Sequence, residues 1–258
     1  MILNRVGNKR RLAKLIVPLF PKHTAYIEPF FGAGAIFFHK PKAKYNFLTD
    51  LDSEVYNFWQ VVINHKDELL EQLELMPVSE ELFNAWKKEV PTDKVLKALR
   101  FLFLSNFSYL GTMDTLRIKL GNQKNAIISN IKSFLADCIS DAYICNRDFE
   151  VFLKSISFHD KRPDKVNTFC YSDPPYVDKI QGMYNAPKWT LQDLERLIDI
   201  LNGMGIKYAI SEYSTESVLK LAEEKGLNVH YLKELQTLKD RNVEILITNY
   251  KTNQLSLF

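Results

Sequence analysis

The residues best suited to chemistry in this sequence form one short stretch, Asp173-Pro174-Pro175-Tyr176. An apolar run over residues 168–171 precedes the stretch and predicts a buried strand that ends near the acid. Neither proline has a backbone N–H and each fixes its own φ, so the strand has to stop here. The result is a stiff corner that presents a carboxylate, a backbone carbonyl and an aromatic ring. An ordinary turn is the alternative, but ligands bind at the carboxyl ends of strands in open α/β sheets, so the corner is a candidate site.

A glycine turn follows the first expected strand, residues 25–28, in the sequence Pro29-Phe30-Phe31-Gly32-Ala33-Gly34. Glycine lets the backbone approach a ligand closely, and the N–H groups at the start of a following helix can face it. We expect such a helix directly after the turn. Gly-x-Gly alone is a weak signal, but a strand, a glycine turn and a helix together are typical of a nucleotide-like cofactor site.

Two more acids follow expected strands. Asp50 ends the strand over residues 45–49, where it is placed to accept hydrogen bonds from ribose hydroxyls. The alternative is that the acid caps the helix that begins near residue 54. Asp148 and Phe149 follow the strand over residues 142–145 and can hold an adenine by a hydrogen bond and by packing.

The candidate site offers hydrogen-bond acceptors and a ring, but the sequence contains no Ser/His pair and no cluster with metal-ligand spacing. This set suits an aromatic exocyclic amine as the substrate nucleophile. Asp173 and the carbonyl of Pro174 can each accept one N–H, which points the nitrogen lone pair at an electrophile, while Tyr176 stacks on the base. An arylammonium is acidic, so its proton can leave after the transfer. A base in a duplex must first be flipped out.

Helical patterns replace the strands between residues 55 and 137, and the expected helices cover residues 55–63, 66–75, 80–89 and 92–103. We interpret this region as an insert between the second and third strands of an α/β domain. Four polar or aromatic residues near its middle are candidates for contact with a polyanion and its bases, namely Asn106, Ser108, Tyr109 and Arg117. Arginine can grip phosphate or guanine, and tyrosine can wedge into a base step. Helix core is the alternative for this stretch and suits its apolar residues better.

The remaining segments predict further helices over residues 8–20, 191–201 and 215–225, and strands over residues 206–211, 227–232 and 243–250. Asn8 is expected to cap the first of these helices, and Thr190 with Asp193 the second, which should end near Gly203. Gly226 is expected to stop the third helix. Residues 177–188 lack periodicity and are expected to form a mobile loop over the site.

The totals fit a soluble globular protein, with 46% hydrophobic and 25% charged residues in 258 and a net charge of +3. No apolar run approaches the ~20 residues that span a bilayer. Cys138, Cys145 and Cys170 lack metal-like spacing and are interpreted as reduced core residues. We therefore expect a cytoplasmic monomer that binds no metal and no membrane.

The order of these segments resembles the Dam-like DNA adenine (N6) methyltransferase family, which carries the Asp-Pro-Pro-Tyr motif. Besides Asp173 to Tyr176, five segments carry the resemblance: the N-terminal Arg5-Val6-Gly7-Asn8-Lys9, the cofactor loop from Glu28 to Gly34, the ribose acid Asp50, the pair Asp148-Phe149, and the hairpin over residues 241–250. Lys9 matches the family lysine, whereas Arg5 stands where the family has an aromatic residue. Glu212 follows Ser211 where the family commonly has Ser-Asn.

The resemblance implies S-adenosylmethionine as methyl donor and an adenine in DNA as substrate. It implies a catalytic role for Asp173, Pro174, Pro175 and Tyr176, and cofactor contacts for ten residues: Arg5, Lys9, Glu28, Phe30, Gly32, Gly34, Asp50, Asp148, Phe149 and Asp173. RNA adenine, the cytosine amine and a glutamine side chain are alternative substrates, and a non-catalytic DNA-binding subunit is an alternative role. A dinucleotide oxidoreductase shares the glycine turn but gives no reason for the proline corner.

The fold that the resemblance implies is α/β and Rossmann-like, the class I methyltransferase fold, in which helices flank a seven-stranded mixed sheet whose last strand is antiparallel. Residues 1–54 and 138–258 would form the catalytic domain, and residues 55–137 a helical target-recognition domain. The last five residues, Gln254-Leu255-Ser256-Leu257-Phe258, resemble the peptide by which many bacterial DNA enzymes bind the sliding clamp. An exposed apolar tail often indicates a partner, and the alternative is a tail folded back onto the sheet.

Overall fold

The computed structural model describes residues 2–5, 7–118, 123–132, 139–158, 164–177, 188–236 and 241–252. Three sequence predictions lie outside these ranges: most of the loop over residues 177–188, Cys138, and the tail Gln254–Phe258.

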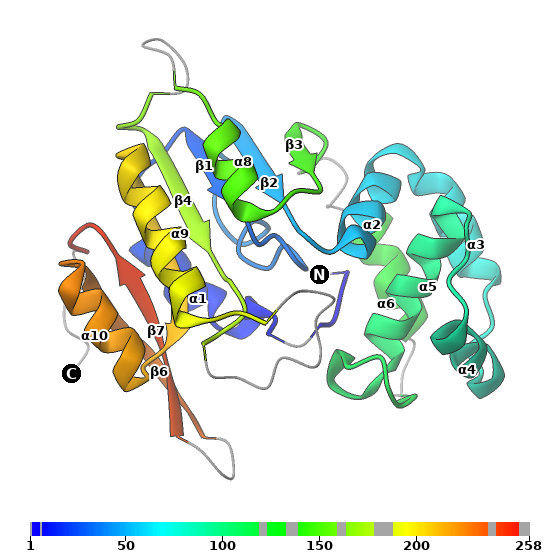
Figure 1. Ribbon diagram of the computed structural model, residues 1–258. Helices are drawn as coiled ribbons and strands as arrows, with labels where there is room; N and C mark the ends of the chain where they lie inside the picture. The colour runs from blue at the N-terminus through cyan, green and yellow to red at the C-terminus, as the bar shows by residue number, and fades with distance from the viewer. Residues whose placement is uncertain are drawn as a thin grey trace.

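In the described part of the chain, seven strands form one mixed sheet (Figure 1). The strands are β1 (Ala25–Glu28), β2 (Tyr45–Thr49), β3 (Ala142–Cys145), β4 (Thr168–Ser172), β5 (Lys207–Tyr213), β6 (Asn228–Gln236) and β7 (Arg241–Thr248). Their order in the sheet is β3-β2-β1-β4-β5-β7-β6. The first five run parallel, and β7 is antiparallel to both of its neighbours. The predicted fold class, including the antiparallel last strand, is confirmed.

Nine α-helices accompany the sheet in the described residues: α1 (Ala13–Ile16), α2 (Ser53–Asn64), α3 (Lys66–Leu75), α4 (Glu80–Lys88), α5 (Lys94–Phe107), α6 (Gln123–Asn130), α8 (Phe149–Ser155), α9 (Leu191–Met204) and α10 (Glu216–Glu224). In Figure 1 the helices α2 to α6 gather beside the sheet, apart from α8, α9 and α10, which cover one side of it. The predicted domain boundary between residues 54 and 55 falls within the first turn of α2. The target-recognition role of the helical group α2 to α6 stays a prediction.

Both faces of the sheet are buried, and successive side chains of each strand point to opposite faces. Ile27, Cys170 and Ile210 belong to the apolar core that includes α8, α9 and α10. Tyr26 and Tyr171 belong to the core on the opposite face, which continues into α2–α6. Burial on both faces explains why every residue of β4 is buried and why its central residues 169–171 do not alternate between apolar and polar.

Two helix predictions near the N-terminus are wrong. Residues 9–19 form two 3₁₀ turns around the four-residue α1 instead of one helix, with Pro18 in the first turn of the second 3₁₀ segment. Asn8 nevertheless caps the first turn as predicted, because its side chain accepts a hydrogen bond from Arg10 N at 2.9 Å. No regular helix follows the glycine turn, where residues 35–39 form turns.

The predictions for the later helices hold better. The expected capping box between Thr190 and Asp193 is present at the start of α9. That helix continues past Gly203 and ends at Gly205, whose φ of +67° gives the left-handed conformation that closes a helix. Gly226, with a φ of +66°, follows α10 as predicted.

None of the helices that the structure describes is both long and apolar enough to cross a membrane. Cys145 and Cys170 are buried free thiols, in agreement with their predicted place in the core.

Candidate active site

The carboxyl ends of β1, β2 and β4 bring three predicted site segments to one edge of the sheet. β1 lies between β2 and β4, so the glycine turn after β1 lies between Asp50, which follows β2, and Asp173, which follows β4. The chain order of the strands also reverses between β1 and β4, and the crevice outside such a switch point is the usual ligand site in open α/β sheets.

Hydrogen bonds tie the glycine turn to Asp50. Gly32 N donates to Asp50 Oδ2 at 2.7 Å, and Asp52 N donates to Asp50 Oδ1 at 2.9 Å. Burial raises the pKa of Asp50, and these two bonds oppose the rise. Trp59, which sequence reasoning did not single out, donates from Nε1 to Gly32 O at 2.9 Å.

The glycine turn is crowded on one side and open on the other. Gly34 has a φ of +68°, and a Cβ there would lie 2.6 Å from the Phe38 ring. Gly32 has a φ of +51°, yet a Cβ there would meet no atom within 4 Å. The backbone at Gly32 therefore has open space beside it, as a ligand-binding turn requires.

Three aromatic rings form a cluster next to this turn. The Phe30 ring centroid lies 5.5 Å from that of Phe149 and 5.4 Å from that of Trp189. Asp148, predicted to act with Phe149, caps α8 by accepting a hydrogen bond from Glu150 N at 2.9 Å. Trp189 was missed at the sequence level because it lies 40 positions from Phe149 and belongs to no motif.

One ammonium group lies between two carboxylates at the proline corner. Lys9 Nζ is 2.8 Å from Asp173 Oδ1 and 3.2 Å from Glu244 Oε1 on β7. The Tyr176 hydroxyl donates to the same Glu244 oxygen, and Lys9 Nζ lies 4.6 Å from the centre of the Tyr176 ring. Lys9 therefore joins the proline corner to β7.

The charges at the corner are mutually dependent. Burial raises the pKa of Asp173, and the Lys9 ammonium opposes that rise. Burial alone would lower the pKa of Lys9, but Asp173 and Glu244 together outweigh it, so the pKa of Lys9 is raised. Lys9 thus stays charged and favours the ionised, hydrogen-bond-accepting form of Asp173.

Residues 2–5 and 7–9, which we name the N-terminal strap, connect this corner to the helical group. Asn106 Nδ2 donates to Ile2 O at 2.8 Å, and Arg5 pairs with Asp52 at 3.0 Å. Gly111, two residues after the exposed Tyr109, packs against the backbone of the strap so closely that a Cβ there would lie 2.3 Å from Asn4 O. The strap therefore contacts the helical group, the acid beside Asp50 and, through Lys9, the corner.

Two of the four predicted DNA contacts are not supported by the structure. Asn106 is buried and donates to backbone carbonyls, and Ser108 is buried and accepts from Met113 N at 2.9 Å. Both side chains stabilise the local backbone, and in this conformation they are buried away from any bound DNA. Tyr109 and Arg117 are exposed, and the Arg117 guanidinium lies 5.4 Å from the Tyr109 ring centre.

Two predicted cofactor residues are bound to other side chains of the protein. Arg5 pairs with Asp52 and lies over the Phe101 ring at 5.2 Å, so it reaches the turn only through Asp52 and Asp50. Glu28 is buried and accepts a hydrogen bond from Tyr26 at 2.8 Å. Burial raises the pKa of Glu28 well above its ordinary value.

Glu212 and Glu244 are site residues to which sequence reasoning gave no role. Glu212 on β5 is fully buried and accepts hydrogen bonds from Val177 N at 2.8 Å and Tyr213 N at 2.7 Å. Each acid stands next to or near an apolar run of its strand, residues 208–210 before Glu212 and residues 245–247 after Glu244. Burial of an acid is costly without partners, so a single acid in such a strand is the signal that could have found them.

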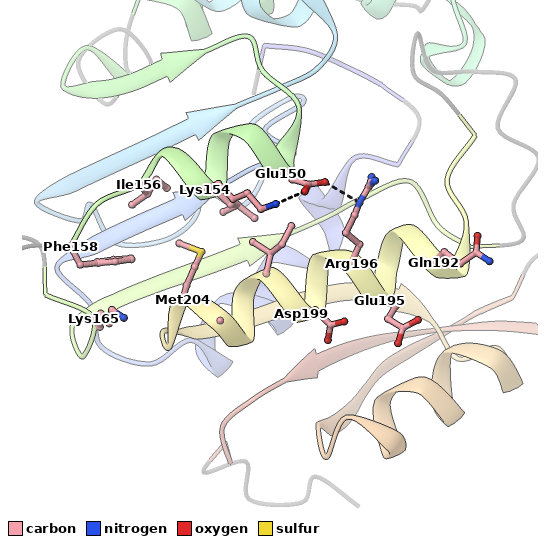
Figure 2. Close-up of a pocket in the computed structure, with 13 residues that line it drawn as sticks. Glu150, Lys154, Ile156, Phe158, Lys165, Gln192, Glu195, Arg196, Asp199 and Met204 are labelled. Carbon is pink, nitrogen blue, oxygen red and sulfur yellow. Dashed lines mark hydrogen bonds and ion pairs between the residues drawn. The ribbon is translucent and has the colours of Figure 1, made fainter.

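A separate groove of about 710 Å³ lies between α8 and α9 (Figure 2). Three of its charged side chains pair with one another: Glu150 lies 2.6 Å from Lys154 and 3.4 Å from Arg196. The apolar residues Ile156, Phe158 and Met204 also line it. The groove contains none of the residues of the proline corner or the glycine turn.

Comparison with known proteins matches residues 6–238 to the family described as D12 class N6 adenine-specific DNA methyltransferase. The modification methylase StsI of Streptococcus sanguinis is 26% identical over 99% of this chain and 43% of that protein. The type II methyltransferase M1.LlaDCHI of Lactococcus lactis subsp. cremoris is 26% identical over 95% of this chain and 93% of that protein. The DNA adenine methylase of Escherichia coli K12 is 24% identical over 78% of this chain and 75% of that protein. The chain thus spans less than half of the StsI methylase but nearly all of M1.LlaDCHI.

Proposed function

This chain belongs to the family of D12 class N6 adenine-specific DNA methyltransferases, and on that premise we propose that it methylates the exocyclic amine of a flipped-out adenine in DNA. The observation that carries the proposal is the meeting of Asp173 with the glycine turn and Asp50 at the carboxyl ends of neighbouring parallel strands. RNA adenine, the cytosine amine and a non-catalytic role are not favoured, because the matching family is described as adenine-specific for DNA.

The described residues fit S-adenosylmethionine as the methyl donor. Gly32 offers open backbone, Asp50 offers a half-buried carboxylate for hydroxyl groups, and the ring cluster with Phe30 and Phe149 suits a flat adenine. When bound, the cofactor supplies an electrophilic methyl group on a positively charged sulfur. No group of metal-ligating side chains is needed for this transfer, because the amine itself is the nucleophile.

The proline corner then orients and stabilises the amine. Asp173 accepts one N–H of the amine, and the Pro174 carbonyl accepts the other, which aims the nitrogen lone pair at the methyl group. Positive charge develops on that nitrogen during transfer, and the carboxylate stabilises it. A carboxylate is too weak a base to deprotonate the neutral amine, so the proton leaves after transfer. Lys9 contributes by favouring the ionised form of Asp173.

We expect Tyr176 to stack on the flipped base, as the sequence predicts. Its hydroxyl is fixed by Glu244, and the Tyr213 ring lies edge-on with centroids 4.4 Å apart. Lys9 Nζ lies over the ring of Tyr176. A stacked base therefore has to use the opposite face or displace the ammonium group.

The turn after α5 is our candidate for DNA contact. Tyr109 and Leu110 are 54% and 59% exposed, and Arg117 lies beside them. An exposed aromatic–apolar pair next to a guanidinium suits insertion at a base step combined with phosphate contact. The clamp-binding role of residues 254–258 stays a prediction on residues outside the described ranges.

Replacement of Asp173 tests the proposed function. We expect Asp173→Ala to lower methyl incorporation into DNA by about a hundredfold or more, because the acceptor for the developing charge is lost. S-adenosylmethionine affinity, measured by calorimetry, should be largely retained. Asp141→Ala, which removes an exposed carboxylate that pairs with Lys42, is the control and should leave the rate unchanged. Undiminished methylation in Asp173→Ala would refute the mechanism.

A further inference from the structure

The backbone ladder between β4 and β5 ends where the proline corner begins. β4 pairs with β5 as far as Ser172, which is opposite Ile210. Pro174 and Pro175 have no N–H groups, so the ladder cannot continue through them. Val177 directly follows Tyr176, and its N–H donates to a side chain of β5 instead of to the backbone of that strand.

That side chain is Glu212, two residues beyond Ile210 on β5. Its Oε1 accepts from Val177 N at 2.8 Å, and its Oε2 accepts from Tyr213 N at 2.7 Å. The Tyr213 ring in turn packs edge-on against the ring of Tyr176 at 4.4 Å. Glu212 thus fixes the backbone on one side of Tyr176 and the residue that packs against its ring.

Resting on the proposed function, we propose that Glu212 is a positioning residue that sets the geometry of the Asp-Pro-Pro-Tyr corner for methyl transfer. It lies at the position where the resemblance leads us to expect asparagine, and it acts through Val177 and Tyr213 without touching the substrate. An amide can satisfy only one of the two N–H donors, because its NH₂ group faces the other.

The charge state of Glu212 gives the role a measurable signature. Burial raises the pKa of Glu212 to about 8, against the effect of its two N–H bonds. The charged groups that face it are Asp173, which raises the pKa further, and Lys9, which lowers it. Above that pH both oxygens accept fully, and below it one of them carries a proton. The transfer rate should therefore rise between about pH 7 and pH 9 because of Glu212.

The test compares wild-type protein with Glu212→Gln, and with Glu212→Asn as a second variant if Glu212→Gln does not fold. Single-turnover methylation should fall roughly tenfold or more in the variant, since small misplacements of reacting groups are costly. Its rise near pH 8 should disappear, whereas the melting temperature and S-adenosylmethionine affinity should change little. Glu223→Gln, on an exposed position of α10, is the control and should match the wild type.

Hydrogen exchange at the Val177 and Tyr213 amides separates this inference from the proposed function. At least one of the two amides should exchange faster in Glu212→Gln than in the wild type, whether or not the protein methylates DNA, because the variant keeps only one acceptor for them. If an active wild type and Glu212→Gln share the same rate and pH profile, the inference is overturned. If the wild type is inactive, the proposed function fails, and equal protection of both amides in the two proteins would still overturn the positioning role.

Discussion

Replacement of Gly111 by alanine should disturb the protein far beyond the exposed turn in which it lies. Gly111 has a φ of +76°, and a Cβ there would lie 2.3 Å from Asn4 O, a backbone atom of the N-terminal strap. A carbon and an oxygen in ordinary contact are farther apart, so the strap has to move by about 1 Å. Arg5 follows Asn4 directly, so its 3.0 Å pair with Asp52 should be disrupted as well.

The expected loss of stability has two parts. An alanine held in the left-handed region costs about 1–2 kcal/mol. An extra carbon forced into a packed contact costs about 1–3 kcal/mol more. Gly226→Ala isolates the first part, because Gly226 has a φ of +66° and a Cβ there would meet nothing within 4 Å. The difference between the two variants therefore measures the contact with the strap.

Unfolding in urea, followed by tryptophan fluorescence, measures both variants. We expect Gly111→Ala to lose about 2–5 kcal/mol of unfolding free energy and Gly226→Ala about 1–2 kcal/mol. Calorimetry with S-adenosylmethionine should show weaker binding for Gly111→Ala alone, because Arg5 supports Asp50 through Asp52. Equal losses of stability in the two variants would refute the close packing of the strap against the turn.

Two further predictions concern buried lysines. Lys9→Met should reduce methyl transfer at pH 7 about a hundredfold. Without the Lys9 ammonium the pKa of Asp173 rises further, so the residual rate of the variant should recover at higher pH. A pH–rate profile of the variant that runs parallel to that of the wild type would contradict this role of Lys9. Lys40, which lies 4.0 Å over the Tyr26 ring, has a pKa lowered by burial from 10.5 to about 8. Folding therefore disfavours the charged form by about 3 kcal/mol below pH 8, and wild-type stability should rise by that amount between pH 8 and 10.5. Lys40→Met should remove this rise in urea unfolding measured across that pH range, and an unchanged slope would argue against the shift.

The sequence alone determined the strands, most helices and the position of the proline corner at the end of a strand. The strand predictions rested on apolar runs and on glycine and proline positions, which are local signals that survive in any fold. The motif Asp173-Pro174-Pro175-Tyr176 likewise predicts the end of a strand, because the two prolines have no N–H groups with which to continue the ladder. Pro18 explains only the C-terminal end of the helix expected over residues 8–20, because residues 9–11 already form a 3₁₀ turn and α1 begins only at Ala13.

Only the tertiary structure decided which side chains face the site. Asparagine and serine suit both DNA contacts and hydrogen bonds to the local backbone, so the residue types of Asn106 and Ser108 do not decide between the two roles. Their burial in the folded chain argues against DNA contact. Glu244 and Glu212 come from strands far along the chain, yet the antiparallel pairing of β5 with β7 brings both to the corner. Lys9 meets Asp173 across more than 160 positions of sequence. Such contacts depend on how strands are ordered in the sheet, and no local pattern encodes that order.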